Sequence, residues 1–379
     1  MKKGKNKKKK MKAGARAAII GGSIVGFILV AAVAIVCVLI HFINKMNYVP
    51  LVEDYTIRSQ TVPHIEDVTN PMVVEETSKD SSQEELDEYQ SLAEAALENV
   101  KGEYEELGEI YNILLIGSDT REQYDAGRSD TMILISINRQ QKRIVATSFL
   151  RDLYVKLPQR GYDKINAAYA WGGVEMLLET LEYNFSLHID KYISVDFLSF
   201  VKVVDILGGI DVDVQEDELF WCNQYIHASN LLLGEPEHSD YLEKADGSFQ
   251  HLSGKQALAY SRFRYVGNGD FTRTERQRKV INIIFDKMKK VSAGTLIELL
   301  DSILPMVTTN IPTGEFLELI AILPEMSKYD IFSWSVPDDS YKFLTIDGVS
   351  SIGIDFNHYI DKIYKYMYAD IDELQKVTQ

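Results

Sequence analysis

Arginine is concentrated in one short stretch of this sequence. The segment SRFRYVGNGDFTRTERQRK, residues 261–279, holds five of the thirteen arginines in a chain of formal net charge −16. A guanidinium grips phosphate oxygens bidentately, and each charged hydrogen bond contributes about 1.5–3 kcal/mol. The last 101 residues carry nine lysines and no arginine, although lysine would serve solvation equally well. The pattern favours anion binding, and the alternative is a set of surface arginines with one buried structural pair.

A predicted helix would aim two of these arginines inward. Thr272 and Glu275 match a capping box, which predicts that a helix begins near Arg273. One face of that helix would carry Arg273, Arg276, Gln277, Val280, Ile281 and Ile284. The helix dipole disfavours cations in the first turn, so their presence indicates that an anion binds there. Arg262 and Arg264, two apart on a segment predicted to be extended, would point in one direction.

Carboxylates and further arginines are predicted to meet at the ends of three strands. The β-rich runs are residues 111–117, 131–137 and 143–149, and the polar turn NRQQK joins the last two. A turn centred on Gln140 places Asp130 opposite Leu150, and the first strand must end at the same edge. The polar residues expected at this edge are Asp119, Arg121, Arg128, Asp130, Arg151 and Asp152. The group is either a functional site or a rim of solvated ion pairs, which contribute little per pair.

Acids beside arginines suit metal-assisted chemistry at a diphosphate. Asp119 and Asp130 would hold Mg²⁺, which prefers one or two carboxylates together with phosphate oxygens and water. The seven histidines show no metal-ligand spacing, and the sequence offers no Ser/His/Asp or Cys/His constellation. Phosphoryl transfer asks a protein mainly for positioning and charge stabilisation, so a covalent nucleophile is not required.

The elements that would position these residues alternate between strand and helix. A helix is predicted over residues 174–183, after Gly172 and Gly173, and a strand, a helix and a second strand follow over residues 192–214. Helices near residues 295–303 and 315–324 and a strand at 332–336 continue the alternation. Such alternation predicts a single α/β domain.

A membrane anchor is predicted at the N-terminus. Residues 1–16 hold nine Lys or Arg and no acid, and residues 17–43 follow as 27 residues without Asp, Glu, Lys or Arg. About 20 residues suffice to cross a bilayer, and a cleaved signal peptide has a shorter apolar core. On the C-terminal side of this span, a lone Lys45 faces the nine basic residues of the N-terminal side. We therefore predict a cytoplasmic tail at 1–16, a single transmembrane helix at 17–43 and an extracellular remainder.

The extracellular part is predicted to begin with an acidic stalk, residues 44–103, that contains a spacer helix. Ser82 and Glu85 match a capping box, and the apolar residues that follow at helical spacing are Leu86, Tyr89, Leu92, Ala93, Ala96, Leu97 and Val100. Apart from the tail, 31 Lys or Arg face 56 Asp or Glu, so nucleic-acid binding is not expected. Cys222 is the sole cysteine beyond the span, which predicts an ordinary core without disulfides and is typical of a Gram-positive type surface.

Several segments resemble the LytR-CpsA-Psr (LCP) family of membrane-anchored cell-wall enzymes. They are NILLIGSDTRE, GRSDTMILISIN, SFLRDLYV, KINAAYAWGG, DFLSFVKVVDILGGIDVDV, LSGKQALAYSRFR and GDFTRTERQRKVI, in family order over residues 110–285. The resemblance implies one extracellular α/β catalytic domain, residues 104–379, in which helices flank a central mixed β-sheet. It also implies residence in the cell membrane, close to lipid-linked substrates.

The resemblance implies a phosphotransferase that moves a glycopolymer from a polyprenyl-diphosphate carrier to a peptidoglycan hydroxyl. Mg²⁺ or Mn²⁺ at Asp119 and Asp130 would assist, and the lipid tail would occupy an apolar tunnel between sheet and helices. The residues implied to bind the diphosphate, directly or in support, are Arg121, Arg128, Arg151, Arg262, Arg264, Arg273, Arg276 and Gln277. The implied catalytic residues are Asp119, Asp130, Arg151 and Asp152. We hypothesise that Asp152 is the base that activates the acceptor hydroxyl.

The sequence departs from the family pattern in a few places, and two other functions stay open. Leu150 and Leu153 flank the Arg-Asp pair where the family commonly has proline and a small hydroxyl residue, and Arg278 replaces a frequent second glutamine. Residues 216–250 are interpreted as a variable insertion. The same metal and arginines could serve a hydrolase acting on polyprenyl diphosphate. A non-enzymatic membrane regulator or attenuator is the third possibility.

Overall fold

The computed structural model describes residues 40, 43–51, 80–100, 110–118, 127–245, 248–288, 290–326 and 328–369. The chain divides into two compact units, Met1–Lys45 and Met46–Gln379, and the second is described here. The predicted tail and nearly all of the predicted membrane span lie outside the described residues. Within the described ranges, no helix combines the length and apolar character needed to cross a membrane.

The centre of the domain is a mixed sheet with the strand order β1-β10-β7-β2-β3-β4-β11. Its strands are β1 Asn47–Tyr48, β2 Tyr111–Ser118, β3 Ser129–Asn138, β4 Arg143–Phe149, β7 Lys191–Asp196, β10 Thr308–Thr309 and β11 Asp330–Val336. β2, β3 and β4 form an antiparallel meander, whereas β7 pairs with β2 and β11 pairs with β4 in parallel. Most central positions are apolar on both faces because both faces are covered, as sheets with parallel pairs require. The predicted α/β fold with a central mixed sheet is confirmed.

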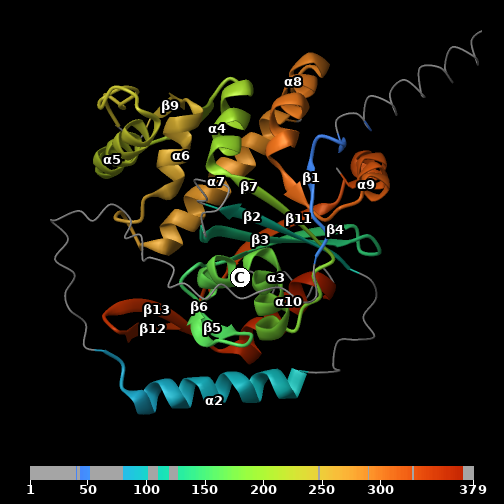
Figure 1. The fold of residues 1–379 in the computed structure, drawn as a ribbon, viewed down its shortest axis with the longest axis vertical. Helices are drawn as coiled ribbons and strands as arrows, with labels where there is room; N and C mark the ends of the chain where they lie inside the picture. The colour runs from blue at the N-terminus through green and yellow to red at the C-terminus, as the bar shows by residue number, and fades with distance from the viewer. Residues whose placement is uncertain are drawn as a thin grey trace, which may run out of the picture. The chain divides into compact units, whose positions relative to one another are not determined.

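Two layers of helices cover the sheet (Figure 1). One layer contains α3 Ile165–Phe185, α10 Phe356–Tyr368 and, outside them, α2 Gln83–Val100. The opposite layer contains α4 Phe197–Ile206, α6 Gly254–Arg262, α7 Asp270–Met288, α8 Ala293–Ile303 and α9 Thr313–Met326. Strand residues alternate between the two layers, so that Leu114 joins the α3–α10 core while Ile113 packs with Met326 of α9. The candidate site lies on the second face.

The remaining elements are short ribbons and connectors. The ribbons are β5 Tyr154–Leu157 with β6 Gly161–Lys164, β8 Ile210–Asp213 with β9 Phe249–Leu252, and β12 Tyr341–Ile346 with β13 Val349–Ile354. A short 3₁₀ turn, Leu304–Met306, follows α8. Among its described residues, the insertion at 216–250 contains α5 Glu216–Leu233 and the first residues of β9. Its Cys222, Ile226 and Leu242 share a core with Ala257 and Phe263, so it packs beside α6.

Helix α3 begins earlier than the sequence pattern predicted. It starts at Ile165, not at Val174, and Gly172 and Gly173 interrupt it with non-helical backbone angles. Gly173 has φ +69°, a conformation that costs a side-chain-bearing residue energy. Glycine was interpreted as marking a helix start, but here it marks a kink within one buried helix.

Helix α2 lies in the predicted stalk and packs on the folded domain, as an amphipathic spacer helix was expected to do on the domain or on a partner. Leu86, Tyr89, Ala93 and Ala96 are buried, whereas Leu92 points to solvent. The Tyr89 hydroxyl donates a hydrogen bond of 2.8 Å to the carbonyl of Tyr154. The predicted helix is therefore present, and together with β1 it makes part of the stalk segment an integral element of the domain.

Candidate anion-binding site and apolar cavity

A cavity of about 200 Å³ lies between the sheet and helices α4, α6 and α7. Its interior is apolar, with Leu115, Ile133, Val195, Phe200, Leu258 and Val280 among the lining residues. Charged and polar residues also line it: Asp130, Thr131, Arg151, Asp196, Ser261, Arg262, Arg273 and Gln277. An apolar space with a few convergent polar groups is the usual form of a ligand site. This one suits a molecule with a long apolar part and an anionic head.

Asp130 owes its direction to an irregularity in the sheet. Gly117 pairs with Thr131 and Ser118 with Ser129, so Asp130 is the extra residue of a β-bulge. A Cβ on Gly117 would lie 3.0 Å from the Cβ of Thr131, and glycine permits this close approach. Oδ1 of Asp130 lies 2.8 Å from Nη1 of Arg151. Continued past its last pair, Ile133 with Ser148, the β3–β4 register would set Asp130 opposite Arg151, one residue beyond the predicted Leu150.

Arg151 contacts a second acid, which in turn pairs with a lysine. Nε of Arg151 lies 3.7 Å from Oδ2 of Asp152, whose Oδ1 lies 2.6 Å from Nζ of Lys164. All three side chains are largely buried. The backbone adds a further tie, because the N–H of Asn166 donates to the Arg151 carbonyl at 3.3 Å. Asp152 does not line the cavity, and this arrangement orients Arg151.

Lys164 was not singled out from the sequence. It lies within the segment KINAAY and immediately precedes α3. No cluster of charges and no regular spacing around it indicates a functional role. Asp152 and Lys164 are brought together because β5 and β6 pair as a hairpin.

Arg262 reaches the cavity from the last turn of α6. The prediction of an extended segment was wrong here, because a capped helix runs through Arg262 and ends there. A cation near a helix C-terminus is favoured by the dipole. The guanidinium lies 4.4 Å from the ring centre of Phe197 and 5.5 Å from that of Tyr225, and these contacts fix its direction. Arg264 follows the helix and does not line the cavity.

Arg273 lines the cavity from the first turn of α7. The helix begins at Asp270, three residues before the predicted start. Thr272 does not cap it in the predicted way, since its hydroxyl accepts a hydrogen bond from the N–H of Asn268. Arg273 remains in the first turn, however, and is only 4% exposed. A buried cation at a positive helix end needs compensating negative charge.

Arg276 and Gln277, predicted to share one face, have different surroundings. Arg276 is buried and pairs with Glu218 of α5 at 2.8 Å. It also donates to the carbonyl of Phe263 at 2.9 Å and lies over that ring at 3.8 Å. Gln277 lines the cavity and donates to the carbonyl of Ser261 at 3.4 Å. Arg276 therefore ties α5 and the α6–α7 loop together, and Gln277 faces the cavity.

Three arginines from different elements act on one carboxylate. Burial alone would raise the pKa of Asp130, but the charges of Arg151, Arg273 and Arg262 outweigh that effect and hold the pKa below its ordinary value. Asp130 is thus an anion in a region of net positive charge. The cavity lining holds three arginines and two aspartates, Asp130 and Asp196, so its remaining positive charge is complementary to a further anion.

The remaining predicted site residues either lie outside the described residues or do not line the cavity. Asp119 and Arg121 lie outside the described residues, and Arg128 is described but does not line the cavity. Among the residues that the structure describes, no group of three or more His, Cys, Asp or Glu is arranged to hold a metal ion. Asp130 alone nevertheless fits the chemistry of Mg²⁺, because it is ionised and Mg²⁺ takes most of its other ligands from water and phosphate.

Comparison with known proteins gives a consistent assignment. The profile of the LytR_cpsA_psr family matches residues 72–378. The chain is 34% identical over 189 residues to "Polyisoprenyl-teichoic acid--peptidoglycan teichoic acid transferase TagU" of Enterococcus faecalis, covering 49% of this chain and 56% of that protein. The transferase TagV of Bacillus subtilis is 30% identical over 297 residues, covering 77% of this chain and 69% of the relative. The chain spans about half the length of several curated relatives.

A solved structure supports the same fold. The crystal structure of protein gbs0355 from Streptococcus agalactiae is similar with a TM-score of 0.56 at 28% identity. The match covers 70% of this chain and 91% of that one.

Proposed function

The chain belongs to the LytR_cpsA_psr family, and we propose that it transfers a glycopolymer from a polyprenyl-diphosphate carrier to a hydroxyl of peptidoglycan. One observation carries the proposal: Arg151, Arg262 and Arg273 gather with Asp130 beside an apolar cavity. The relatives named above as polyisoprenyl-teichoic acid transferases support the substrate class.

The site matches both parts of such a donor. A diphosphate carries several negative charges within a few ångströms, and guanidiniums from three elements can hold its oxygens in fixed positions. The cavity interior beyond them is apolar and suits the first isoprene units of the carrier. A free sugar phosphate would use the arginines but leave the apolar interior without a partner.

The proposed reaction is a displacement at phosphorus. The acceptor oxygen bonds to the phosphorus nearer the glycopolymer, its proton is released, the bond to the bridging oxygen breaks, and polyprenyl monophosphate leaves. Arg151, Arg262 and Arg273 stabilise the charge that develops on the phosphate oxygens. Gln277, adjacent in the cavity, offers an amide for further hydrogen bonding. In this reaction the protein positions the donor and the acceptor and neutralises the phosphate charge. It forms no covalent intermediate with the substrate.

We infer that Mg²⁺ or Mn²⁺ takes part as well, held by Asp130 together with Asp119. When bound, such an ion neutralises diphosphate charge that the arginines leave uncompensated. We also propose that residues 17–43 form a single-pass signal anchor, with residues 1–16 in the cytoplasm and the catalytic domain outside a Gram-positive type membrane. That placement keeps the site close to a lipid-linked donor.

The proposal is tested by following polyprenyl monophosphate with the full chain in detergent micelles or nanodiscs. Incubation with a lipid-linked glycopolymer should release polyprenyl monophosphate and label peptidoglycan only when both donor and acceptor are present. Release without acceptor would identify a hydrolase instead. Absence of turnover under both conditions would favour a regulator. Asp130→Asn should abolish the acceptor-dependent reaction.

A further inference from the structure

A row of aromatic side chains runs from helix α7 to the β12–β13 hairpin. Phe271 of α7 and Tyr341 of β12 have ring centres 4.6 Å apart, and the rings of Tyr341 and Phe343 follow at 5.6 Å in an edge-to-face arrangement. Phe343 is 60% exposed, and the other two are partly exposed. We call Phe271, Tyr341 and Phe343 the aromatic strip.

The alternation of β12 explains why these rings are not in the core. Leu344 is fully buried, and Nζ of Lys342 lies 5.4 Å from the ring centre of Tyr89 in α2. Successive strand residues point to opposite faces, so Tyr341 and Phe343 share the face directed away from α2. The hairpin thus uses one face for folding and presents aromatic rings on the other. The three rings are contiguous, and a contiguous exposed apolar surface marks an interaction site where a single exposed ring does not.

Helix α7 carries residues of both the aromatic strip and the cavity lining. Phe271 comes two residues before Arg273, and Arg278 comes directly after Gln277, while Arg273 and Gln277 both line the cavity. Phe271 and Arg278 are seven residues apart and so lie on one side of the helix. Nη1 of Arg278 is buried, and it has no hydrogen-bond partner among the residues that the structure describes. Burial lowers the pKa of Arg278, and the charges of Glu275 and Asp338 offset only part of this effect.

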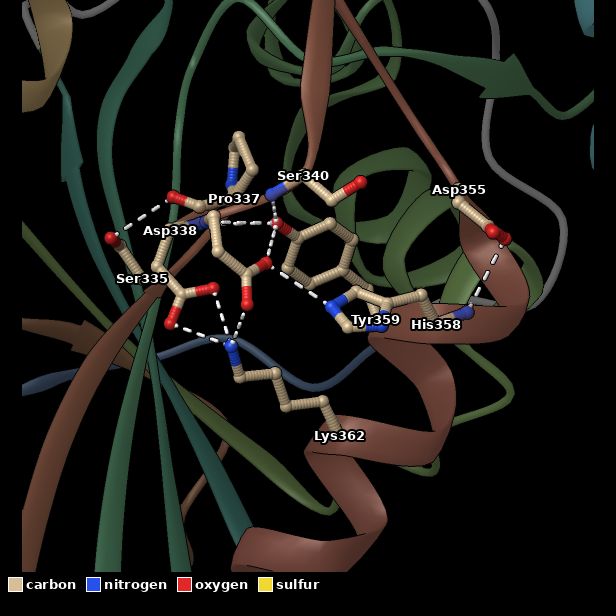
Figure 2. A network of polar contacts seen from close by, with 9 residues as sticks. Ser335, Pro337, Asp338, Ser340, Asp355, His358, Tyr359 and Lys362 are labelled. Carbon is tan, nitrogen blue, oxygen red and sulfur yellow. Dashed lines mark hydrogen bonds and ion pairs between the residues drawn. The ribbon is translucent and has the colours of Figure 1, made fainter. Parts of the chain in front are cut away.

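A polar network holds the loop that leads into the aromatic strip (Figure 2). The Tyr359 hydroxyl accepts hydrogen bonds from the N–H groups of Asp338, Asp339 and Ser340 at 3.2, 3.3 and 2.9 Å. Nζ of Lys362, a side chain only 8% exposed, lies 2.8 Å from a carboxylate oxygen of each aspartate. Both anchoring residues come from α10, which packs on the main core. The residues next to Tyr341 are therefore fixed before any ligand arrives, which lowers the entropy cost of binding.

We propose that the aromatic strip, with Arg278 and Asp338 at its edge, binds the acceptor glycan strand of peptidoglycan. One face of a pyranose ring presents C–H groups that pack on aromatic rings, while its hydroxyls accept and donate hydrogen bonds at the edge of the site. The charges around the aromatic strip largely cancel, because Lys362 pairs with Asp338 and Asp339 and the Arg278 guanidinium interacts with Glu275 and Asp338. Such a surface offers little attraction to a polyanionic glycopolymer, so an uncharged sugar chain is the fitting occupant. Naming the sugar chain as the acceptor rests on the proposed function.

The subsite is tested by direct binding, because binding requires no turnover. The probe is chitotetraose, an uncharged N-acetylglucosamine oligomer, titrated by calorimetry into the full chain in nanodiscs. We expect Tyr341→Ala and Phe343→Ala each to weaken binding about tenfold, the change that follows from losing about 1.4 kcal/mol. Phe220→Ala is the matched control, because Phe220 is a similarly exposed phenylalanine on α5. Phe343 is exposed, so its variant should melt at the wild-type temperature.

The outcomes separate the subsite from the transferase. Wild-type affinity in both aromatic variants, or no chitotetraose binding by the wild type, would overturn the subsite. A glycerol-phosphate oligomer that binds through these residues in place of chitotetraose would overturn the assignment to the acceptor. Strip-dependent chitotetraose binding by a protein that releases no polyprenyl monophosphate would uphold the subsite and refute the proposed reaction.

Discussion

Nη1 of Arg151 lies 2.8 Å from Oδ1 of Asp130, and this contact joins the residues just after β4 to a bulge in β3. The bulge turns Asp130 towards the cavity, and Arg262 and Arg273 add their charges from α6 and α7. Three arginines, from the end of β4, from α6 and from α7, thus converge on the one carboxylate of Asp130 in β3. We attribute the proposed diphosphate binding to this convergence.

The cavity arginines should be essential for transfer and dispensable for folding. We expect Arg262→Ala and Arg273→Ala each to lower acceptor-dependent release of polyprenyl monophosphate by more than about a hundredfold, the usual loss on removing a charge-stabilising donor. Circular dichroism and thermal melting check that the variants remain folded. The control is Arg139→Ala in the exposed β3–β4 turn, which removes the same charge far along the strands. Wild-type rates in both cavity variants would refute diphosphate binding by Arg262 and Arg273.

Arg276 should matter for stability and not for the chemistry. Arg276→Ala leaves Glu218 buried without its cation, and loss of one partner of such a pair typically costs about 3–5 kcal/mol. Replacing both partners, as Arg276→Met with Glu218→Leu, should restore most of the free energy of unfolding. Urea denaturation measures both effects. A full loss of activity in a double variant that regains stability would instead assign Arg276 to the diphosphate site.

Lys164 should act through Asp152 on the position of Arg151. Lys164→Met removes the 2.6 Å contact to Asp152, and we expect kcat to fall about tenfold while the KM for the acceptor is unchanged. Lys164→Arg should recover part of the loss because it restores a cation. Lys156→Met is the matched control, since Lys156 pairs with Glu94 at the surface, where ion pairs contribute little. An altered acceptor KM with normal kcat would contradict a positioning role.

The stabilising effect of Asp130 should depend on acidity. Because its folded-state pKa lies below the unfolded value, ionised Asp130 stabilises the fold above an unfolded pKa of about 3.9, and the effect fades as the pH falls towards the folded pKa. The difference in unfolding free energy between wild type and Asp130→Asn should therefore be constant near neutrality and shrink below about pH 4. Denaturant titrations across this range measure it. A difference that persists unchanged into strong acid would show that the carboxylate charge is irrelevant.

The sequence predicted the strands and the polar edge because both depend on local patterns. β4 occupies the predicted residues, and Asp130, Arg151 and Asp152 meet as the hairpin geometry required. The helix boundaries were less predictable, since a capping-box match at Thr272 and Glu275 competes with tertiary contacts that extend α7 to Asp270. The family motif placed Arg276 in support of the diphosphate-binding arginines, and helical spacing cannot reveal Glu218, its partner 58 residues away in the insertion. The aromatic strip was missed for a similar reason, because its members come from α7 and β12.

The most direct test of the account is the lipid that the protein carries. Full-length chain extracted in detergent should contain a polyprenyl phosphate or diphosphate detectable by mass spectrometry, and the double variant Arg262→Ala, Arg273→Ala should lose it while remaining folded. Retention of the same phosphorylated lipid by the double variant would show that Arg262 and Arg273 do not bind the diphosphate headgroup. A wild type that carries no such lipid even after incubation with polyprenyl diphosphate would show the same.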